Sequence, residues 1–169
     1  MLLSWIIYSV LLVIRFLGAK QNRYKNEMTE KLKIEFLDHL VLTVADIVRT
    51  CSFYTQVLEM QEVTFGGGRK ALQFGKYKIN LHEYGREVEP KAQCPMPGSA
   101  DLCFITSTPL EVVAHHIQAC GIDILEGPVQ RTGARGTIVS IYLRDPDGNL
   151  IELSNYRESK ERNSGQAVI

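Results

Sequence analysis

The chain of 169 residues is 45% apolar and 22% charged, which is typical of an ordinary globular protein with about one domain. Its 19 basic and 19 acidic residues give a net charge of zero, so recruitment to nucleic acid by charge is not expected. The four cysteines form no C-x-x-C pair and have no zinc-finger spacing. Reduced thiols of a cytosolic type are favoured, although an even count also allows disulfides.

The N-terminal segment is apolar from Leu2 to about Leu17, and basic residues follow it. A helix that spans a membrane needs about 20 apolar residues, and this run is shorter and includes Arg15. A cleaved signal peptide fits the length but lacks a basic start. Three alternatives stay open: membrane association through residues 2–17, a cleaved signal, or an extension without a structural role. For the rest of the chain a cytoplasmic location is favoured.

Residues 21–33 are polar and charged, which indicates a linker. We therefore predict an N-terminal extension over residues 1–33 and one domain over residues 34–157. The last segment, residues 158–169, is expected to be a disordered tail. The domain itself is predicted to contain two similar units, over about residues 34–84 and 100–157.

The first unit is predicted to contain a strand, a helix and three more strands. Alternating apolar residues predict the first strand over residues 36–44. Asp46 then predicts the start of a helix, because aspartate is a preferred N-cap residue. The apolar face of this helix comprises Ile47, Cys51, Tyr54 and Leu58. The later strands are predicted at residues 62–65, 71–74 and 78–84.

The second unit repeats this order. Its first strand is predicted over residues 101–106, and residues 108–111 predict a capping box with Pro109 at the first helical position. Gly121 then ends the helix. The later strands are predicted at residues 122–125, 138–143 and 150–155. A stretch with three prolines, residues 85–98, connects the two units.

The two units align at polar positions. The first strands place His39 opposite Asp101, and the last strands place Asn80 opposite Glu152. Sequence identity between the units is low, so the order of elements is the main sign of a repeat. The predicted fold class is α+β, with paired βαβββ modules whose mixed sheets curl around a cleft.

Glu152 is a charged residue among apolar neighbours in the last strand. Residues 145–149 before it are all turn formers, so a hairpin turn leads into this strand. A carboxylate buried without a partner is unfavourable by several kcal/mol. Glu152 therefore faces either solvent, which often covers one face of an antiparallel sheet, or a partner across the cleft.

Three segments carry a resemblance to a known family: LDHLVLTVADIVRTCSFYTQVLEM, ALQFGKYKINLHEYG and DPDGNLIELSNY. Over about residues 36–157 the chain resembles the vicinal oxygen chelate superfamily. That superfamily includes glyoxalase I, extradiol dioxygenases, fosfomycin-resistance proteins and bleomycin-binding proteins. The resemblance implies a cleft in which a divalent metal ion binds two neighbouring oxygens of a small molecule.

The resemblance also implies metal ligands. His39 matches the histidine of the first strand, and Glu152 matches the carboxylate of the last strand. Asp101 and Asn80 depart from the glyoxalase I pattern, which has histidine or glutamine and glutamate there. Asn80 is a weak ligand, and His82 on the same strand face is its alternative. The predicted ligands of one divalent ion, which is nickel, zinc, manganese or iron, are His39, His82, Asp101 and Glu152.

Other readings of these residues stay open. His82 can be an ordinary strand residue, and Asp101 can pair with a lysine or arginine. Glu152 is the predicted catalytic residue, because a glutamate that leaves the metal can act as a base. In the loop RTGARG, Arg131 and Arg135 are predicted to bind an anionic substrate, since guanidinium groups pair well with carboxylate or phosphate. A solvated loop is the alternative.

The resemblance favours a metal-dependent lyase, isomerase or dioxygenase that acts on a small oxygen-rich molecule. A metal-free binding module and a non-catalytic interaction protein are the alternatives. Because Asn80 replaces one of the paired glutamates of glyoxalase I, a glutathione hemithioacetal substrate is not predicted. Members of the superfamily often complete the cleft by dimerising, so a homodimer is a further expectation.

Overall fold

The computed structural model describes residues 31–157 of the chain, which divides into two units, Met1–Phe36 and Leu37–Ile169. In the described part of the first unit, Lys33 and Glu35 form an exposed ion pair. The apolar N-terminal segment and the predicted C-terminal tail lie outside the described residues. Among the residues that the structure describes, no helix has both the length and the apolar character needed to cross a membrane.

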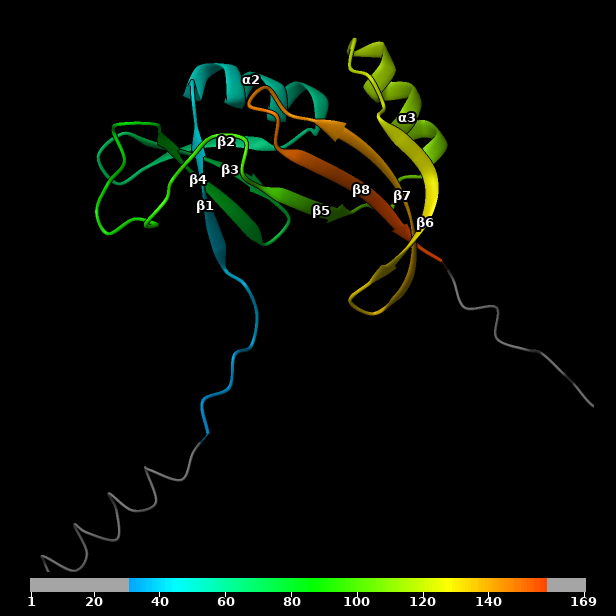
Figure 1. The fold of residues 1–169 in the computed structure, drawn as a ribbon, viewed down its shortest axis with the longest axis horizontal. Coiled ribbons are helices and arrows are strands. Elements are labelled where there is room, and N and C mark those ends of the chain that lie inside the picture. Colours follow the sequence, from blue (N-terminus) through cyan, green and yellow to red (C-terminus); the bar gives the residue numbers. More distant parts are fainter. Residues whose placement is uncertain (1–30, 158–169) are drawn as a thin grey trace, which may run out of the picture. The chain divides into compact units, whose positions relative to one another are not determined.

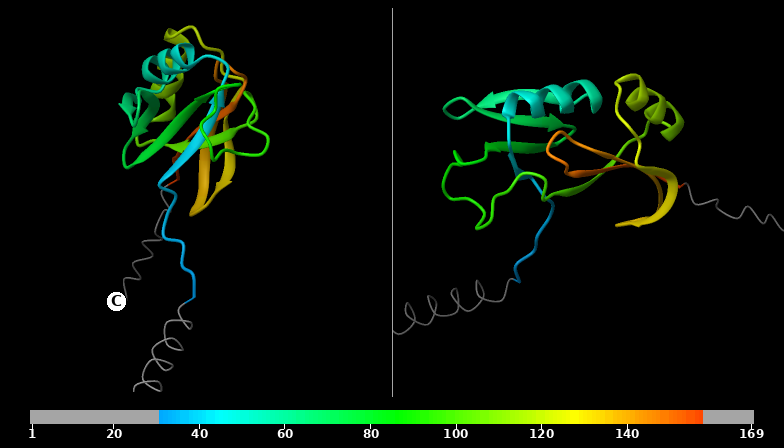
Figure 2. Two further views of the ribbon diagram at one scale, coloured as in Figure 1. Left: turned by 90° about the vertical axis from the view of Figure 1, so that its left-hand side faces the viewer. Right: turned by 45° about the horizontal axis from the view of Figure 1, so that its top comes forward.

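The second unit contains two four-stranded sheets, each with one helix (Figure 1). The first sheet has the order β1-β4-β3-β2 and consists of β1 (His39–Val44), β2 (Gln61–Phe65), β3 (Arg69–Phe74) and β4 (Tyr77–Glu83), with α2 (Ile47–Val57). The second has the order β5-β8-β7-β6 and consists of β5 (Asp101–Ile105), β6 (Glu126–Gly133), β7 (Gly136–Arg144) and β8 (Leu150–Tyr156), with α3 (Leu110–Ala119). Both helices lie on the same side of the sheets (Figure 2). The predicted α+β class and the βαβββ repeat are confirmed.

The strand pairing supports the alignment of the two halves. In each sheet the first and last strands are parallel, and the other neighbours are antiparallel. Asn80 and Glu152 each pair with the residue two positions after the start of the first strand. Those strands start at His39 and Asp101, so the matched positions of the sequence repeat are also matched in the sheets.

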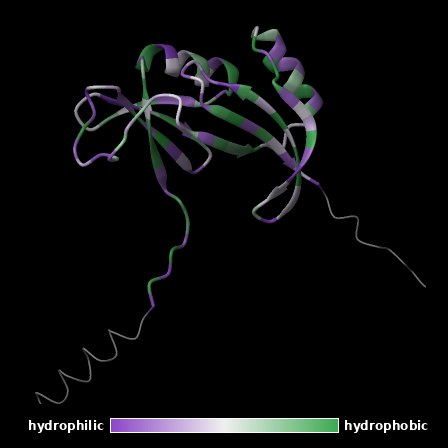
Figure 3. Ribbon diagram, in the orientation of Figure 1, coloured by the Kyte–Doolittle hydropathy of each residue, from purple (hydrophilic) through white to green (hydrophobic). Residues whose placement is uncertain are grey.

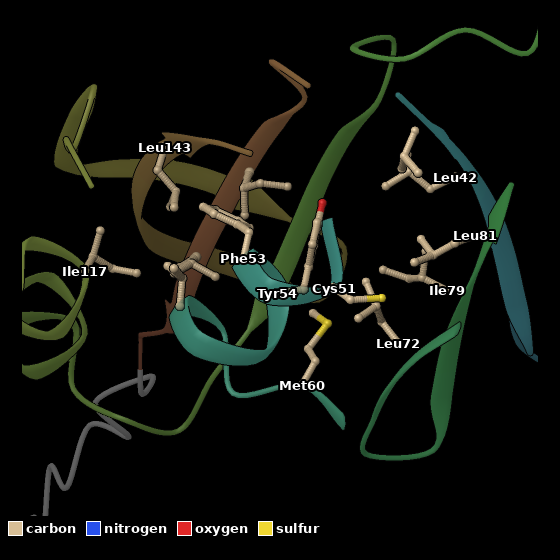
Figure 4. Close-up of a cluster of buried hydrophobic side chains, with 14 of the residues drawn as sticks. Leu42, Cys51, Phe53, Tyr54, Met60, Leu72, Ile79, Leu81, Ile117 and Leu143 are labelled. Carbon is tan, nitrogen blue, oxygen red and sulfur yellow. The ribbon is translucent and has the colours of Figure 1, made fainter. Parts of the chain in front are cut away.

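One hydrophobic core lies between the sheets and their helices. Polar and apolar residues alternate along several strands, as the colours of Figure 3 show, and alternate residues such as Ile141 and Leu143 of β7 belong to this core. Figure 4 shows Leu42, Ile79 and Leu81 of the first sheet pointing toward Tyr54 of α2. Burying one such side chain fully stabilises the fold by about 1.5–3 kcal/mol. The remaining residues of each strand lie on the opposite side, here called the helix-free face.

The predicted strand over residues 122–125 is wrong. The chain there has no regular structure, and β6 begins only at Glu126. It contains Pro128 and an irregular register after Glu126. Both are tolerated because β6 is an edge strand, with no neighbour on its outer side. Residues 131–136 are predicted to form a loop. They are instead the end of β6, a tight turn and the first residue of β7.

The predicted capping box of the second helix is also wrong. Pro109 is the N-cap residue of α3, and no side chain of the predicted box makes a capping hydrogen bond. Instead, the backbone N–H of Leu110 donates to Asn155 Oδ1 of β8 at 3.2 Å. The acceptor therefore comes from the sheet on which the helix packs. The other helix follows the prediction, since Asp46 accepts from the backbone N–H of Arg49 at 2.9 Å.

The β7–β8 turn, residues 145–149, joins the second sheet to α2. Tyr54 of α2 donates its hydroxyl to Asp145 Oδ2 at 3.0 Å, and both residues are buried. Arg49 of the same helix pairs with Asp147 Oδ1 at 2.8 Å. Burial, and next the charge of Asp145, raise the pKa of Tyr54 well above its usual range, so its hydroxyl stays a donor. This turn fixes the two halves to each other.

Candidate functional site

The predicted site residues lie on the helix-free faces of two different sheets. His39, Asn80 and His82 belong to the first sheet, and Asp101 and Glu152 belong to the second. Within residues 31–157, no three His, Cys, Asp or Glu side chains are placed to hold a metal ion together. A single chain therefore does not bring the predicted ligands into one group, and the ligand set stays a prediction.

Glu152 is held by hydroxyl groups of the second sheet. Ser140 of β7 donates to Glu152 Oε1 at 2.5 Å, and Ser154 donates to the same oxygen at 3.4 Å. The hydroxyls of the two serines are 2.8 Å apart, and both residues are fully buried. Cys103 Sγ lies 3.6 Å from the Ser154 hydroxyl. The carboxylate is thus oriented by hydroxyl groups of β7 and β8.

These contacts decide the charge of Glu152. Burial by itself raises the pKa of its carboxyl group, but hydrogen bonds from Ser140, Tyr142, Cys103 and Ser154 outweigh this effect and hold the pKa below its ordinary value. The side chain is therefore an anion at neutral pH. Such a group suits binding a cation or a hydrogen-bond donor better than removing a proton, for which a pKa near neutral is best.

A hollow of about 450 Å³ opens beside Glu152 on the second sheet. Its lining consists of Asp101, Leu125, Glu126, Arg131, Tyr142, Arg144, Leu150 and Glu152. It thus brings together three of the predicted site residues, namely Asp101, Arg131 and Glu152. Its volume is within the range of roughly 300–1,000 Å³ that is common for small-molecule sites. Two arginines and three acidic residues in one lining favour a polar ligand.

The two arginines predicted to bind substrate are separated. Arg131 lies in the hollow, where it donates to Tyr142 Oη at 3.1 Å and pairs with Glu126 at 2.8 Å. Arg135 lies in the turn between β6 and β7, with its guanidinium 4.7 Å from the centre of the Tyr156 ring. It is not part of the lining of the hollow. Of the two predicted arginines, Arg131 alone lines the hollow beside Glu152.

On the first sheet two groups have hydrogen-bonding capacity that no described residue uses. His39 Nδ1 lies 2.7 Å from Asp38 Oδ1, and its side chain is 45% exposed. A carboxylate partner on one ring nitrogen leaves Nε2 free, as in many metal-binding histidines. Asn80 Oδ1 is buried and has no hydrogen-bond partner among the described residues. An unpaired buried oxygen costs about 1–3 kcal/mol, which a bound cation or donor would offset.

These observations show how well the residues suit the implied metal ion. The donor types fit a divalent cation, because imidazole, carboxylate and amide oxygen are all common ligands. The orientation of His39 and the unpaired oxygen of Asn80 also fit. The four predicted ligands are divided between the two sheets, so each sheet supplies two of them. His82, the alternative to Asn80, is 9% exposed and lies on the same face.

Sequence reasoning missed Ser140, Tyr142 and Ser154, which hold Glu152 in place. A signal for them was present, because Ser140 and Tyr142 alternate with Ile141 and Leu143 along β7. Polar residues at a period of two in an apolar strand share one face. Strand register then places them beside Glu152, since Tyr142 pairs with Glu152 directly.

Comparison with known proteins identifies the family. The model of the Glyoxalase/Bleomycin resistance protein/Dioxygenase superfamily matches residues 36–153. Virulence protein STM3117 of Salmonella typhimurium is 57% identical over 141 residues, covering 83% of this chain and 98% of that protein. Its crystal structure matches with a TM-score of 0.74 and 61% identity, over 75% of this chain and 100% of that chain. Glyoxalase domain-containing protein RDO1 of Mycosarcoma maydis is 53% identical over 137 residues, covering 81% of this chain and 77% of that protein.

A more distant structure shares the fold alone. TnmS3, an antibiotic binding protein from Streptomyces sp. CB03234, matches with a TM-score of 0.60 and 17% identity, over 75% of this chain and 100% of that chain. Proteins of this fold thus include binders of small molecules. The predicted superfamily is confirmed by the family model and by two relatives that each share more than half of their aligned residues with this chain. The chain belongs to the glyoxalase/bleomycin resistance protein/dioxygenase superfamily.

Proposed function

We propose that this protein is a divalent-metal-dependent lyase, isomerase or dioxygenase that acts on a small oxygen-rich molecule in the hollow beside Glu152. The observation that carries the proposal is the state of Glu152. The predicted carboxylate ligand is oriented by Ser140, held as an anion, and placed in the wall of a hollow of ligand size. The charged lining suits a substrate with several oxygens.

The proposal requires a second copy of the chain. His39 and Glu152 lie on different sheets, and β1 and β5 are edge strands with one neighbour each among the described residues. Edge strands expose unpaired backbone groups. Pairing of β1 of one copy with β5 of another would extend each sheet. The helix-free face with His39 would then adjoin the face with Glu152 of the partner, so a homodimer would contain two shared sites.

The residues of this chain have distinct roles in such a site. When bound, the metal ion supplies a Lewis acid that stabilises negative charge on substrate oxygens. Asp38 holds one ring nitrogen of His39, which presents the other to the site. Glu152 contributes a fixed negative charge. The hydrogen bond from Ser140 favours the ionised form, so loss of that bond would raise the pKa of Glu152.

Metal content tests the proposal, measured by elemental mass spectrometry on chain purified without a chelating tag. We expect about one divalent ion per chain, and its loss in His39→Ala and in Glu152→Ala. His115→Ala, an exposed position on α3, is the matched control and should keep the metal. No binding after reconstitution with nickel, zinc, manganese and ferrous iron would overturn the proposal.

Mixed dimers test the sharing of sites. In a dimer of one His39→Ala chain and one Glu152→Ala chain, one of the two shared sites keeps both residues. An equal mixture forms about half of its dimers as mixed dimers and should therefore regain about a quarter of the wild-type metal, although each variant alone binds none. A site within one chain would regain nothing, because each chain lacks one ligand. Native mass spectrometry identifies the mixed dimer.

A metal-free binding module is the second candidate, and one observation favours it. Glu152 is already bound by Ser140, and Arg131 is already paired with Glu126. Charged groups of the hollow thus already have partners within the chain and do not require a cation. In this case Arg131→Ala weakens ligand binding, whereas His39→Ala and chelators leave it unchanged. Titration of both variants with the ligand found in a screen separates the two candidates.

We also infer a closer relation within the superfamily. Residues 74–92, 97–106 and 126–136 resemble the vertebrate glyoxalase domain-containing protein 5. The name of that protein states a domain and no reaction. The inference predicts that a substrate found for either protein is accepted by the other, which a parallel screen of both proteins tests.

A further inference from the structure

A second cavity lies between the two halves on the side of the helices. Its volume is about 360 Å³, and its lining comes from the end of α2, from α3 and from β3, β5 and β8. Phe74 of β3 and Phe104 of β5 meet here edge to face, with ring centres 5.2 Å apart. Leu153 belongs to the same lining, and its neighbour Glu152 lies on the opposite face of β8. This cavity is therefore separate from the hollow of the proposed site.

Glu59 lines this cavity in a conformation that is unusual for glutamate. It follows the last turn of α2 with a φ of +54°, and it is the one non-glycine residue with positive φ in residues 31–157. In the second half, Gly121 follows α3 at the matching position with a φ of +74°. Glycine adopts this conformation easily because it lacks a Cβ atom. Glutamate at this position is strained.

The position of Glu59 is unfavourable for its charge as well. The C-terminal end of a helix carries partial negative charge, so a carboxylate there is repelled. Within the described residues Glu59 forms no ion pair, and the lining of the cavity includes no lysine or arginine. Residues that keep such strain cluster at ligand sites, where the ligand supplies the compensating contact. Here a positively charged group would supply that contact.

The rest of the lining is suited to an apolar ring system. Besides Phe74 and Phe104 it includes Met60 and Val113, and sulfur and aromatic side chains both pack well against rings. His116 is fixed in the wall, because its Nε2–H donates to the Val57 carbonyl at 3.2 Å. An apolar cavity of about 150 Å³ holds benzene, so the present volume suits roughly two fused rings.

We propose that this cavity binds an aromatic molecule of about two fused rings that carries a protonated amine. The rings pack against Phe74 and Phe104, and the ammonium group pairs with the Glu59 carboxylate. The proposal is independent of metal binding and of catalysis beside Glu152. It explains why a strained glutamate stands at this position of the first half, where the second half has an unstrained glycine.

Three probes of one shape test the charge requirement: 1-naphthylmethylamine, 1-naphthylmethanol and 1-naphthoate. Calorimetric titration of the full chain should give the tightest binding for the amine and the weakest for the carboxylate. We expect the amine to bind about fivefold more tightly than the alcohol, as for a partly exposed ion pair. Glu59→Gln should abolish this difference and leave the affinity for the alcohol unchanged. Equal preference for the amine in Glu59→Gln would overturn the proposal.

Further variants locate the binding site. Val113→Trp fills the cavity and should abolish binding of all three probes, whereas Glu111→Gln, an exposed change in the first turn of α3, should alter none of them. Glu59→Gly should raise the midpoint of thermal unfolding and weaken binding of the amine. Binding that survives Val113→Trp but is lost in Glu152→Ala would overturn the proposal and place the probe in the other hollow.

Discussion

Matching positions in the two halves of the repeat differ in whether their polar groups have partners. Glu152 accepts hydrogen bonds from its neighbours, whereas Asn80 Oδ1 has no partner in the described part of the chain. The β7–β8 turn binds α2, whereas the matching β3–β4 turn consists of the exposed residues Gly75 and Lys76. The backbone of Glu59 is strained, and that of the matching glycine is not.

The polar groups of the two halves therefore have different roles. In the second half the turn joins the sheet to α2, and neighbouring hydroxyl groups orient the Glu152 carboxylate in the lining of the hollow. The first half keeps an unpaired oxygen at Asn80 and an unpaired charge at Glu59 within residues 31–157. The buried oxygen of Asn80 is unfavourable unless something outside the chain pairs with it, whereas the Glu59 carboxylate is exposed to solvent. The first half therefore supplies groups that lack a partner inside the chain, whereas the second half supplies a carboxylate that is already oriented.

The largest effect is expected from Asp145→Ala. Its buried carboxylate accepts hydrogen bonds from Tyr54, Asn149 and the backbone of Asp147. Their loss should lower the free energy of unfolding by roughly 3–5 kcal/mol, measured by urea denaturation. Lys76→Ala, in the matching turn, should change it by less than about 0.5 kcal/mol. Similar losses in both variants would remove the contrast between the turns.

Intermediate effects on stability are expected at the matched strand positions, Asn80 and Glu152. Leucine should stabilise the protein at one of these positions and destabilise it at the other. Asn80→Leu removes an unpaired buried oxygen and should stabilise the protein by about 1 kcal/mol. Glu152→Leu removes the acceptor of the Ser140 hydroxyl and should destabilise it by about 1–2 kcal/mol. Both are measured on metal-free protein by denaturation. A loss of stability in Asn80→Leu would mean that Asn80 already has a partner.

The smallest effect is expected in the pH dependence of stability. The pKa of Glu152 is lower in the folded state, so ionisation favours folding. This contribution is complete above the ordinary value of about 4.5 and is lost as the pH falls through the lower folded value. Glu152→Gln should therefore show a shallower loss of unfolding free energy between about pH 5 and 3. Asn80→Gln, which adds no titrating group, should follow the wild type.

The repeat of strand, helix and three strands was predictable because its signals are local. Alternating apolar residues, the Asp46 cap and Gly121 act over a few positions. The prediction failed where a distant residue decides the outcome. The acceptor at the start of α3 is Asn155, and an edge position allows the strand that contains Pro128. Neither fact can be obtained from the neighbouring sequence.

The site shows the same limit. Glu152 stands out in the sequence because it is a charge in an apolar strand. Its partner Ser140 depends on the register between β7 and β8, which a sequence pattern does not specify. The separation of His39 from Glu152 depends on how the two sheets are joined. That arrangement rests on contacts such as Tyr54 with Asp145, between residues far apart in the chain.

The β7–β8 turn has a consequence for the order of events during synthesis. Its contacts connect residues 91 positions apart at Tyr54 and 102 positions apart at Ala45. While the ribosome adds the second half, α2 has been made but the acceptor of its buried hydroxyl does not yet exist. Contacts of such long range form late and slowly. The strand pairings of the first half lie within residues 39–83, but a chain that stops before Asp145 lacks the acceptor of the buried Tyr54 hydroxyl.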